Sequence, residues 1–141
     1  MTYEIISKRL RKTIKVRKPD DIYQVIKRYA NYRQEVFLTI TLSCSHEVIG
    51  IHISTIGLIN RTIIHPREVY IHAILDNAFS IVIAHSHPSG SINPSNEDKE
   101  ITKRIKEAGD LLGINVLDHL IISKKGYYSF RRDGKILFVS Y

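Results

Sequence analysis

His85 and His87 are separated by one residue and directly follow an apolar run, residues 80–84. The run predicts a buried strand, and side chains two residues apart in a strand point the same way. Both imidazoles can therefore face one point in space. Asp98 lies just beyond Ser95, where a helix is predicted to begin. Two imidazoles, a carboxylate and an open fourth position are typical of a catalytic zinc ion, so the spacing indicates a metal-dependent hydrolase.

Ser95 and Asp98 also have a purely structural interpretation. Their Ser-x-x-Asp spacing resembles a capping box, and an acid in the first helical turn stabilises the helix dipole. Neither role excludes function, because a Ser95 hydroxyl at the helix start could also donate to an oxyanion. The isolated histidines are interpreted as ordinary core or surface residues: His46, His52, His65 and His72.

Hydrolysis at such a site also needs a general base, most often a glutamate. Glu47 falls in a predicted hairpin turn, and Glu97 points about 100° away from Asp98 around the helix. Glu35 stands before a predicted strand, and Glu68 lies in the first turn of a predicted helix. Spacing alone does not choose between these two.

Strands and helices alternate along the chain. Strands are predicted at 36–42, 48–54, 80–84 and 116–122, with short final strands ending at 138–139. Helices begin at Pro19 and Pro66, and a third spans Ser95 to Leu112. The second helix is expected to bury Ile71, Ile74, Leu75 and Ala78, and the third to bury Ile101, Ile105, Ala108 and Leu112. Hairpins at both ends favour an α/β fold with one mixed sheet and helices packed on it.

The composition fits a single globular domain. At 141 residues the chain supports one core, and no apolar run approaches the roughly 18–20 residues that span a bilayer. The start of the chain has no signal-peptide pattern, so a cytoplasmic location and no membrane partner are expected. The single Cys44 excludes an intramolecular disulfide and a cysteine-rich zinc site.

The net charge of +7 comes from one segment. Residues 1–18 are therefore predicted to form a basic N-terminal segment ahead of a domain at 19–141. This segment could contact DNA phosphates, or it could be a solvated edge strand in which Ile14 and Val16 alternate with basic residues. Its seven basic residues are Lys8, Arg9, Arg11, Lys12, Lys15, Arg17 and Lys18.

At these residues the chain resembles the RadC family, a branch of the JAB/MPN (JAMM) metalloprotease-like domains. The family motif is a remote glutamate, His-x-His-Pro and then Ser-x-x-Asp; here these are Glu35, residues 85–88 and residues 95–98. The resemblance runs from about Pro19 to the C-terminus. Further RadC-like signatures are His65-Pro66-Arg67-Glu68, Pro88-Ser89-Gly90, Ala108-Gly109 and Leu117-Asp118-His119.

The resemblance implies a JAB1/MPN-type fold, a mixed sheet flanked by helices and distantly like the cytidine deaminases. It implies one zinc ion per chain, held by His85, His87 and Asp98, with Glu35 as the general base and Ser95 stabilising the transition state. Deaminase activity itself is excluded, because that metal site needs a pair of cysteines. Asp118 and His119 could support the ligands, but neighbours in a strand face opposite ways, so at most one points at the site.

Two functions follow as hypotheses. The first is a zinc-dependent hydrolase that cleaves a peptide or isopeptide bond of an unidentified peptide or protein. The second is a DNA-repair-associated accessory domain that binds DNA non-specifically through its basic segment and has little or no hydrolase activity. An inert, homodimeric scaffold of the same fold is a third interpretation.

Overall fold

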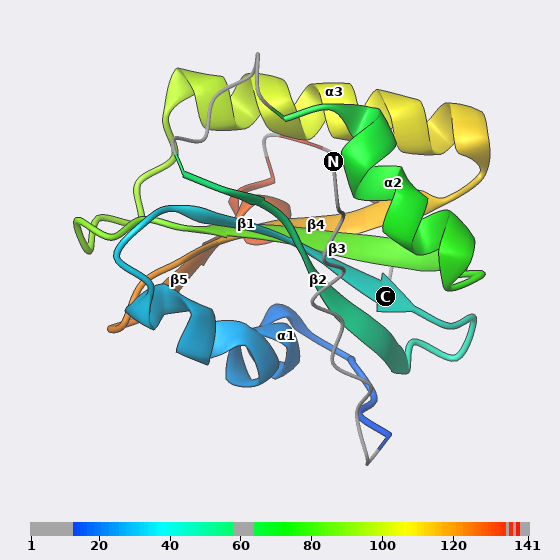
Figure 1. Ribbon diagram of the computed structural model, residues 1–141, viewed down its shortest axis with the longest axis horizontal. Coiled ribbons are helices and arrows are strands. Elements are labelled where there is room, and N and C mark those ends of the chain that lie inside the picture. Colours follow the sequence, from blue (N-terminus) through cyan, green and yellow to red (C-terminus); the bar gives the residue numbers. More distant parts are fainter. Residues whose placement is uncertain (1–12, 58–63, 135, 137, 139–141) are drawn as a thin grey trace.

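The computed structural model describes residues 13–57, 64–134, 136 and 138, and its centre is a five-stranded mixed sheet (Figure 1). The strand order is β2-β1-β3-β4-β5. β1 lies antiparallel to β2 and β3, β3 lies parallel to β4, and β4 and β5 form a hairpin. The predicted α/β class and mixed sheet are confirmed. The strands are β1 (Val36–Leu42), β2 (Val48–Ile56), β3 (Ser80–Ser86), β4 (Asn115–Ile122) and β5 (Tyr127–Ser129).

Helices cover both faces of the sheet (Figure 1). α1 (Pro19–Ile26) continues into the short η1 (Lys27–Asn31) on one face, and α2 (Pro66–Leu75) and α3 (Asn96–Leu112) lie on the other. A last turn, α4 (Phe130–Asp133), follows β5. α3 ends at Gly113, whose φ of 73° is a left-handed conformation that glycine adopts without strain.

A hydrophobic core lies on each side of the sheet. Ile22 and Ile26 of α1 pack with Leu38, Val82 and Leu120 on one side. The core beneath α2 and α3 contains Phe37, Tyr70, Ile83, Ile101 and Ile105. Every residue of β1 and β3 is buried, as expected of central strands with helices on both faces.

The predicted buried face of α2 is wrong. Val69, Tyr70 and Ala73 are the residues it buries, whereas Ile71, Ile74 and Leu75 are 46%, 59% and 65% exposed. This helix is apolar on both sides, so periodicity does not reveal which side meets the core. Ala78 lies beyond α2 and is only partly buried.

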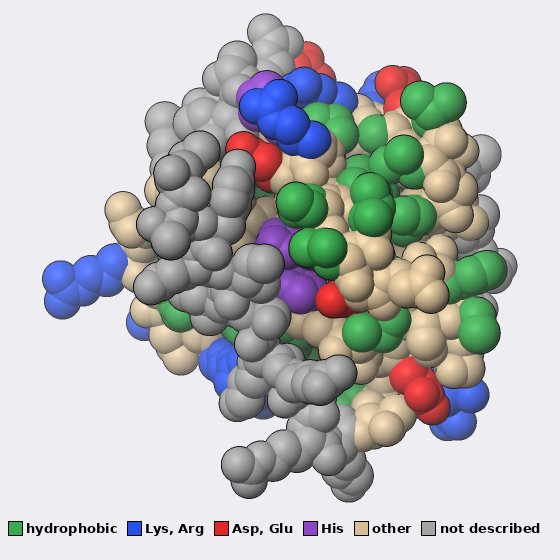
Figure 2. Space-filling view, turned by 45° about the vertical axis from the view of Figure 1, so that its right-hand side comes forward, with side chains coloured by type: hydrophobic (Ala, Val, Ile, Leu, Met, Phe, Trp, Pro, Cys, Tyr) green, Lys and Arg blue, Asp and Glu red, His purple; other side chains and the backbone are tan. Residues whose placement is uncertain are grey.

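α3 buries Ile101 and Ile105 as predicted, but Ala108 is only partly buried and Leu112 is 50% exposed. Leu112 is the last residue of the helix, directly before the Gly113 cap. Together with the outer side of α2, this region presents hydrophobic side chains to solvent, which Figure 2 shows gathered on one face.

The structure differs from the prediction, or extends it, near both ends of the described chain. Val16 N–H donates to the His46 carbonyl and Val48 N–H to the Ile14 carbonyl, each at 2.8 Å, so this part of the basic segment pairs with the β1–β2 hairpin. After β5 the chain forms α4 instead of a further strand; the predicted strand end at 138–139 lies partly outside the described residues. Among the described helices, none is long and apolar enough to cross a membrane.

Candidate metal centre

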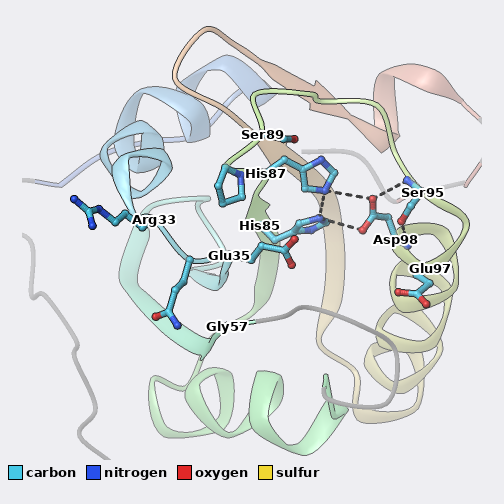
Figure 3. A pocket seen from close by; sticks show the side chains of 11 residues that line it. Arg33, Glu35, Gly57, His85, His87, Ser89, Ser95, Glu97 and Asp98 are labelled. Carbon is cyan, nitrogen blue, oxygen red and sulfur yellow. Dashed lines mark hydrogen bonds and ion pairs between the residues drawn. The ribbon is translucent and has the colours of Figure 1, made fainter.

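His85, His87 and Asp98 converge at one end of the sheet (Figure 3). Their candidate ligand atoms all lie within 4.8 Å of one another. His85 Nε2 lies 2.8 Å from His87 Nε2 and 3.0 Å from Asp98 Oδ1, and His87 Nε2 lies 3.5 Å from Asp98 Oδ2. The structure therefore brings together the three residues predicted from the spacing.

These separations suit a small divalent cation. Ligands about 2.0–2.1 Å from a tetrahedral zinc ion lie about 3.3 Å apart. The observed separations of 2.8 Å, 3.0 Å and 3.5 Å bracket that value. The three residues could therefore hold a metal ion after shifts of a few tenths of an ångström.

The end of β3 sets the positions of both histidines. His85 is the penultimate residue of the strand, opposite Phe37 of β1. His87 lies just past the strand, and its N–H continues the parallel ladder by donating to the Ile122 carbonyl at 3.0 Å. Because this backbone stays extended, the two side chains point the same way. A turn closed by Gly90, with a φ of 87°, then leads the chain toward α3.

The N-terminus of α3 holds the carboxylate. Ser95 N–H donates to Asp98 Oδ2 at 2.7 Å, and Asp98 N–H donates to Ser95 Oγ at 3.1 Å. This is a capping box with aspartate in place of glutamate. Asp98 thus caps the helix with Oδ2 while Oδ1 faces His85, so the capping and ligand interpretations are compatible.

The electrostatics of the cluster favour a bound positive charge. Burial acts to raise the pKa of Asp98, but hydrogen bonds with His85 and His87 outweigh it and hold this pKa well below its ordinary range. The hydrogen bond to Asp98 raises the pKa of His87, against burial, and the Ser91 carbonyl adds to the effect. An ionised carboxylate thus faces two imidazole nitrogens, an arrangement that a proton or a metal cation stabilises.

The cluster opens into a cleft of about 640 Å³ that Glu35, Ser95 and Glu97 also line. Figure 3 shows the Glu35 carboxylate pointing toward the ring of His85, while Glu97 points away from both rings. Of the four glutamates considered as the base, Glu47 and Glu68 are not among the residues that line this cleft. Of the four glutamates, Glu35 is the one that lines the cleft with its carboxylate turned toward the histidines (Figure 3).

Two contacts support the site, and the first of them was not predicted. The Ser86 hydroxyl, between the two histidines, accepts the Val36 N–H at 3.0 Å and so fixes the backbone beside Glu35. His119 lies behind His85, with its Nε2 2.9 Å from His85 Nδ1. The sequence predicted that at most one of Asp118 and His119 points at the site. The structure shows that this residue is His119.

Asp118 faces the opposite side of the sheet and stabilises the start of α4. It accepts hydrogen bonds from the Ser129 hydroxyl at 2.6 Å and from the Arg131 N–H at 3.0 Å. Burial raises its pKa to about 6, although these hydrogen bonds oppose the shift. Asp118 therefore has a structural role and no contact with the metal centre.

Comparison with known proteins agrees with the geometry. Residues 16–135 match the model of the RadC-like JAB domain. The chain belongs to this family of JAB-domain proteins. It is 45% identical over 118 residues to a UPF0758 protein of Alkaliphilus metalliredigens, covering 83% of this chain and 51% of that protein. It is 40% identical over 115 residues to a UPF0758 protein of Thermotoga maritima, covering 82% and 52% respectively. The chain thus spans about half the length of these relatives.

Proposed function

We propose that this domain is a zinc-dependent hydrolase that cleaves a peptide or isopeptide bond. The observation that supports it is the convergence of His85, His87 and Asp98 within 4.8 Å, beside Glu35 in an open cleft. Imidazole ligands suit zinc, and two histidines with one carboxylate leave a coordination position for water.

A bound zinc ion would polarise the scissile carbonyl and lower the pKa of a water molecule to about 7. The chain supplies the remaining functions. Glu35 accepts the proton of the attacking water and passes it to the leaving amine. The Ser95 hydroxyl accepts the Asp98 N–H, so its own proton is available to donate to the oxyanion.

Replacing Glu35 with glutamine tests the proposal. Glu35→Gln preserves the size of the side chain and all three metal ligands, but the amide cannot accept the proton. We expect the variant to bind zinc as tightly as the parent protein and to lose about 10²–10⁴-fold in turnover. Zinc content is measured by elemental analysis, and turnover by digestion of a peptide library followed by mass spectrometry.

Glu97→Gln is the matched control, because Glu97 lines the same cleft but points away from both rings. This variant should keep both zinc and activity. Full activity of Glu35→Gln on a substrate that the parent protein cleaves would show that Glu35 is not the base. A zinc-loaded parent protein that cleaves no member of the library would count against the hydrolase.

Non-specific DNA binding is the second candidate function. It rests on the basic segment, whose seven positive charges equal the net charge of the chain. Of these residues Lys15, Arg17 and Lys18 are described, and all three are exposed. Lys8, Arg9, Arg11 and Lys12 lie outside the described residues.

A further inference from the structure

A buried polar pair, His119 of β4 and Thr102 of α3, lies behind the metal centre. Both side chains are fully buried, at 0% exposure. His119 Nε2 lies 2.9 Å from His85 Nδ1, and His119 Nδ1 lies 2.5 Å from the Thr102 hydroxyl oxygen. The same hydroxyl lies 2.7 Å from the Asp98 carbonyl oxygen. These contacts form a chain of hydrogen bonds from one ligand to another.

The hydroxyl of Thr102 sets the direction of this chain. A carbonyl oxygen only accepts, and two oxygens 2.7 Å apart repel unless a proton lies between them. The single hydroxyl proton of Thr102 therefore points at the Asp98 carbonyl. The Thr102 oxygen must then accept from His119, so the proton of the His119 ring sits on Nδ1.

The environment of His119 keeps its ring neutral. The ring stacks on Phe130 with centroids 4.9 Å apart and meets the edge of Phe37 at 5.9 Å. Neither ring nitrogen of His119 bonds a carboxylate in the described part of the chain: the Asp118 carboxylate accepts only the His119 backbone N–H, and Asp98 meets the network through its backbone carbonyl. A buried imidazolium whose ring nitrogens bond no carboxylate is strongly disfavoured. With its proton on Nδ1, a neutral His119 can only accept at Nε2, so His85 must donate from Nδ1.

We propose that Thr102 and His119 are positioning residues that fix His85 as an Nε2 metal ligand. With its proton held on Nδ1 toward His119, His85 keeps the Nε2 lone pair for the cation, on the side where Asp98 Oδ1 lies 3.0 Å away. The network also connects β3, β4 and α3 by hydrogen bonds. It therefore orients two of the proposed ligands, His85 and Asp98, before a metal ion binds. This inference rests on the proposed metal site and deepens it.

Thr102→Val is the sharpest test, because valine matches threonine in shape and Thr102 is not a proposed ligand. Without the hydroxyl, His119 Nδ1–H has no acceptor, and the His119 proton moves to Nε2. His119 then donates toward His85, which pushes the His85 proton onto the metal-binding nitrogen. We expect zinc affinity to fall about 10–100-fold, the range typical when a residue that orients a metal ligand is replaced.

Thr102→Ser is the matched control, since serine keeps the hydroxyl and should keep the parental affinity. Zinc affinity is measured by competition with a chromophoric chelator, and circular dichroism checks that each variant is folded. The tautomers are read directly from long-range ¹H–¹⁵N spectra of the imidazoles. These should show His119 protonated on Nδ1 in the parent protein and on Nε2 in Thr102→Val.

A second pair of variants acts on His119 itself. Glutamine places its amide near the position of Nε2 and can accept from His85, whereas asparagine reaches only the position of Nδ1. His119→Gln should therefore retain more zinc affinity than His119→Asn. A folded Thr102→Val with parental affinity, or a parent protein with His119 protonated on Nε2, would overturn the proposal.

The outcomes separate this inference from the proposed function. A loss of zinc affinity in Thr102→Val in a protein that cleaves no peptide supports the positioning role and counts against the hydrolase alone. If the parent protein binds no zinc, both proposals fail.

Discussion

His52, His72 and Asp76 form a second histidine cluster, away from the metal centre. His52 Nε2 and the Thr41 hydroxyl each lie 2.6 Å from Asp76 Oδ2, and the His52 and His72 rings stack with centroids 4.5 Å apart. The ring Nδ1 atoms of both histidines are buried without a partner in the described structure. Burial and the nearby His52 lower the pKa of His72 to about 4, against the attraction of Asp76.

This cluster should make the metal-free protein sensitive to acid. His72 titrates near its usual pKa of about 6.5 when unfolded and near 4 when folded, so the unfolded state binds a proton first as the pH falls. Stability should therefore fall between pH 6.5 and pH 4. His72 is only partly buried, so solvent screens its charge. We therefore expect it to contribute about 1–2 kcal/mol to this loss in the free energy of unfolding.

The contribution of His72 is measured by urea unfolding of two proteins, the parent and His72→Phe. Both are kept in chelator so that no metal is bound. Phenylalanine keeps the ring but cannot titrate, so the stability difference between the two proteins should change from pH 7 to pH 4 and stay constant from pH 7 to pH 8. If the stability difference between the two proteins were constant down to pH 4, His72 would not be the group that makes the protein sensitive to acid.

At the residue scale, the sequence predicts contacts that depend on local geometry. His85 and His87 share a direction because strands alternate with period two, and Asp98 follows from the Ser95 cap. The role of His119 required the structure. The β3–β4 register shifts between Ile81 and Val82, and this irregularity helps decide which of two adjacent β4 residues faces the metal centre.

At the scale of elements, the packing of α3 against α2 sets the position of the helix that carries Asp98. Gly109 of α3 lies where an added Cβ would collide with the Tyr70 hydroxyl and the Ile114 carbonyl oxygen. The Tyr70 hydroxyl donates to the Ile105 carbonyl at 2.8 Å, so it is not free to move aside. The close approach explains why the Ala108-Gly109 signature needs glycine at its second position.

Gly109→Ala should therefore destabilise the protein. Overpacking costs about 1–3 kcal/mol or more, and the gain of about 1 kcal/mol from alanine in a helix offsets only part of it. We expect a net loss of about 2 kcal/mol in urea unfolding. Gly126→Ala in the β4–β5 turn is the control, since no atom lies within 4 Å of its added Cβ. Equal stability of the two variants would contradict the packing argument.

The elements themselves were largely predictable, but their packing faces were not. The strands of the central sheet and the start of α3 follow from apolar runs, turn residues and the Ser95 cap. α2 carries apolar residues on both sides, so its periodicity fits two faces equally. Val69, Tyr70 and Ala73 are buried because β1 and α3 lie on that side, which is long-range information that a local pattern does not contain.

At the scale of the whole molecule, the proposed metal site exists only in the folded chain. Its ligands come from β3 and α3, and His119 comes from β4. A cation that binds the native state alone stabilises it by about 2.7 kcal/mol at a concentration 100 times its dissociation constant.

Thermal unfolding with and without zinc tests this linkage. Zinc should raise the midpoint of the parent protein and of Glu97→Gln, and should leave His87→Ala unchanged. An equal rise in His87→Ala would place the stabilising ion elsewhere. The predicted homodimer stays a prediction, although exposed apolar side chains of α2 and α3 gather on one face of the molecule (Figure 2).

DNA binding by the basic segment can be tested without changing the residues of the segment that pair with the β1–β2 hairpin. Val16 is fully buried and Ile14 pairs with Val48, so deleting the whole segment would also remove structure. Replacing Lys8, Arg9, Arg11 and Lys12 with glutamine removes four positive charges and leaves Ile14 and Val16 unchanged. If these residues bind phosphates, affinity should fall and the slope of log K against log salt should flatten by up to about 0.9 for each phosphate no longer neutralised. An unchanged slope, or no measurable binding by the parent protein near 50 mM salt, would reject this function.

The most direct test of the metal centre is an anomalous difference map, at the zinc edge, from crystals grown with stoichiometric zinc. We expect one strong peak per chain, about 2.0–2.2 Å from His85 Nε2, His87 Nε2 and an Asp98 carboxylate oxygen. A peak on other residues, or no peak between these three side chains in zinc-soaked crystals, would contradict the assignment.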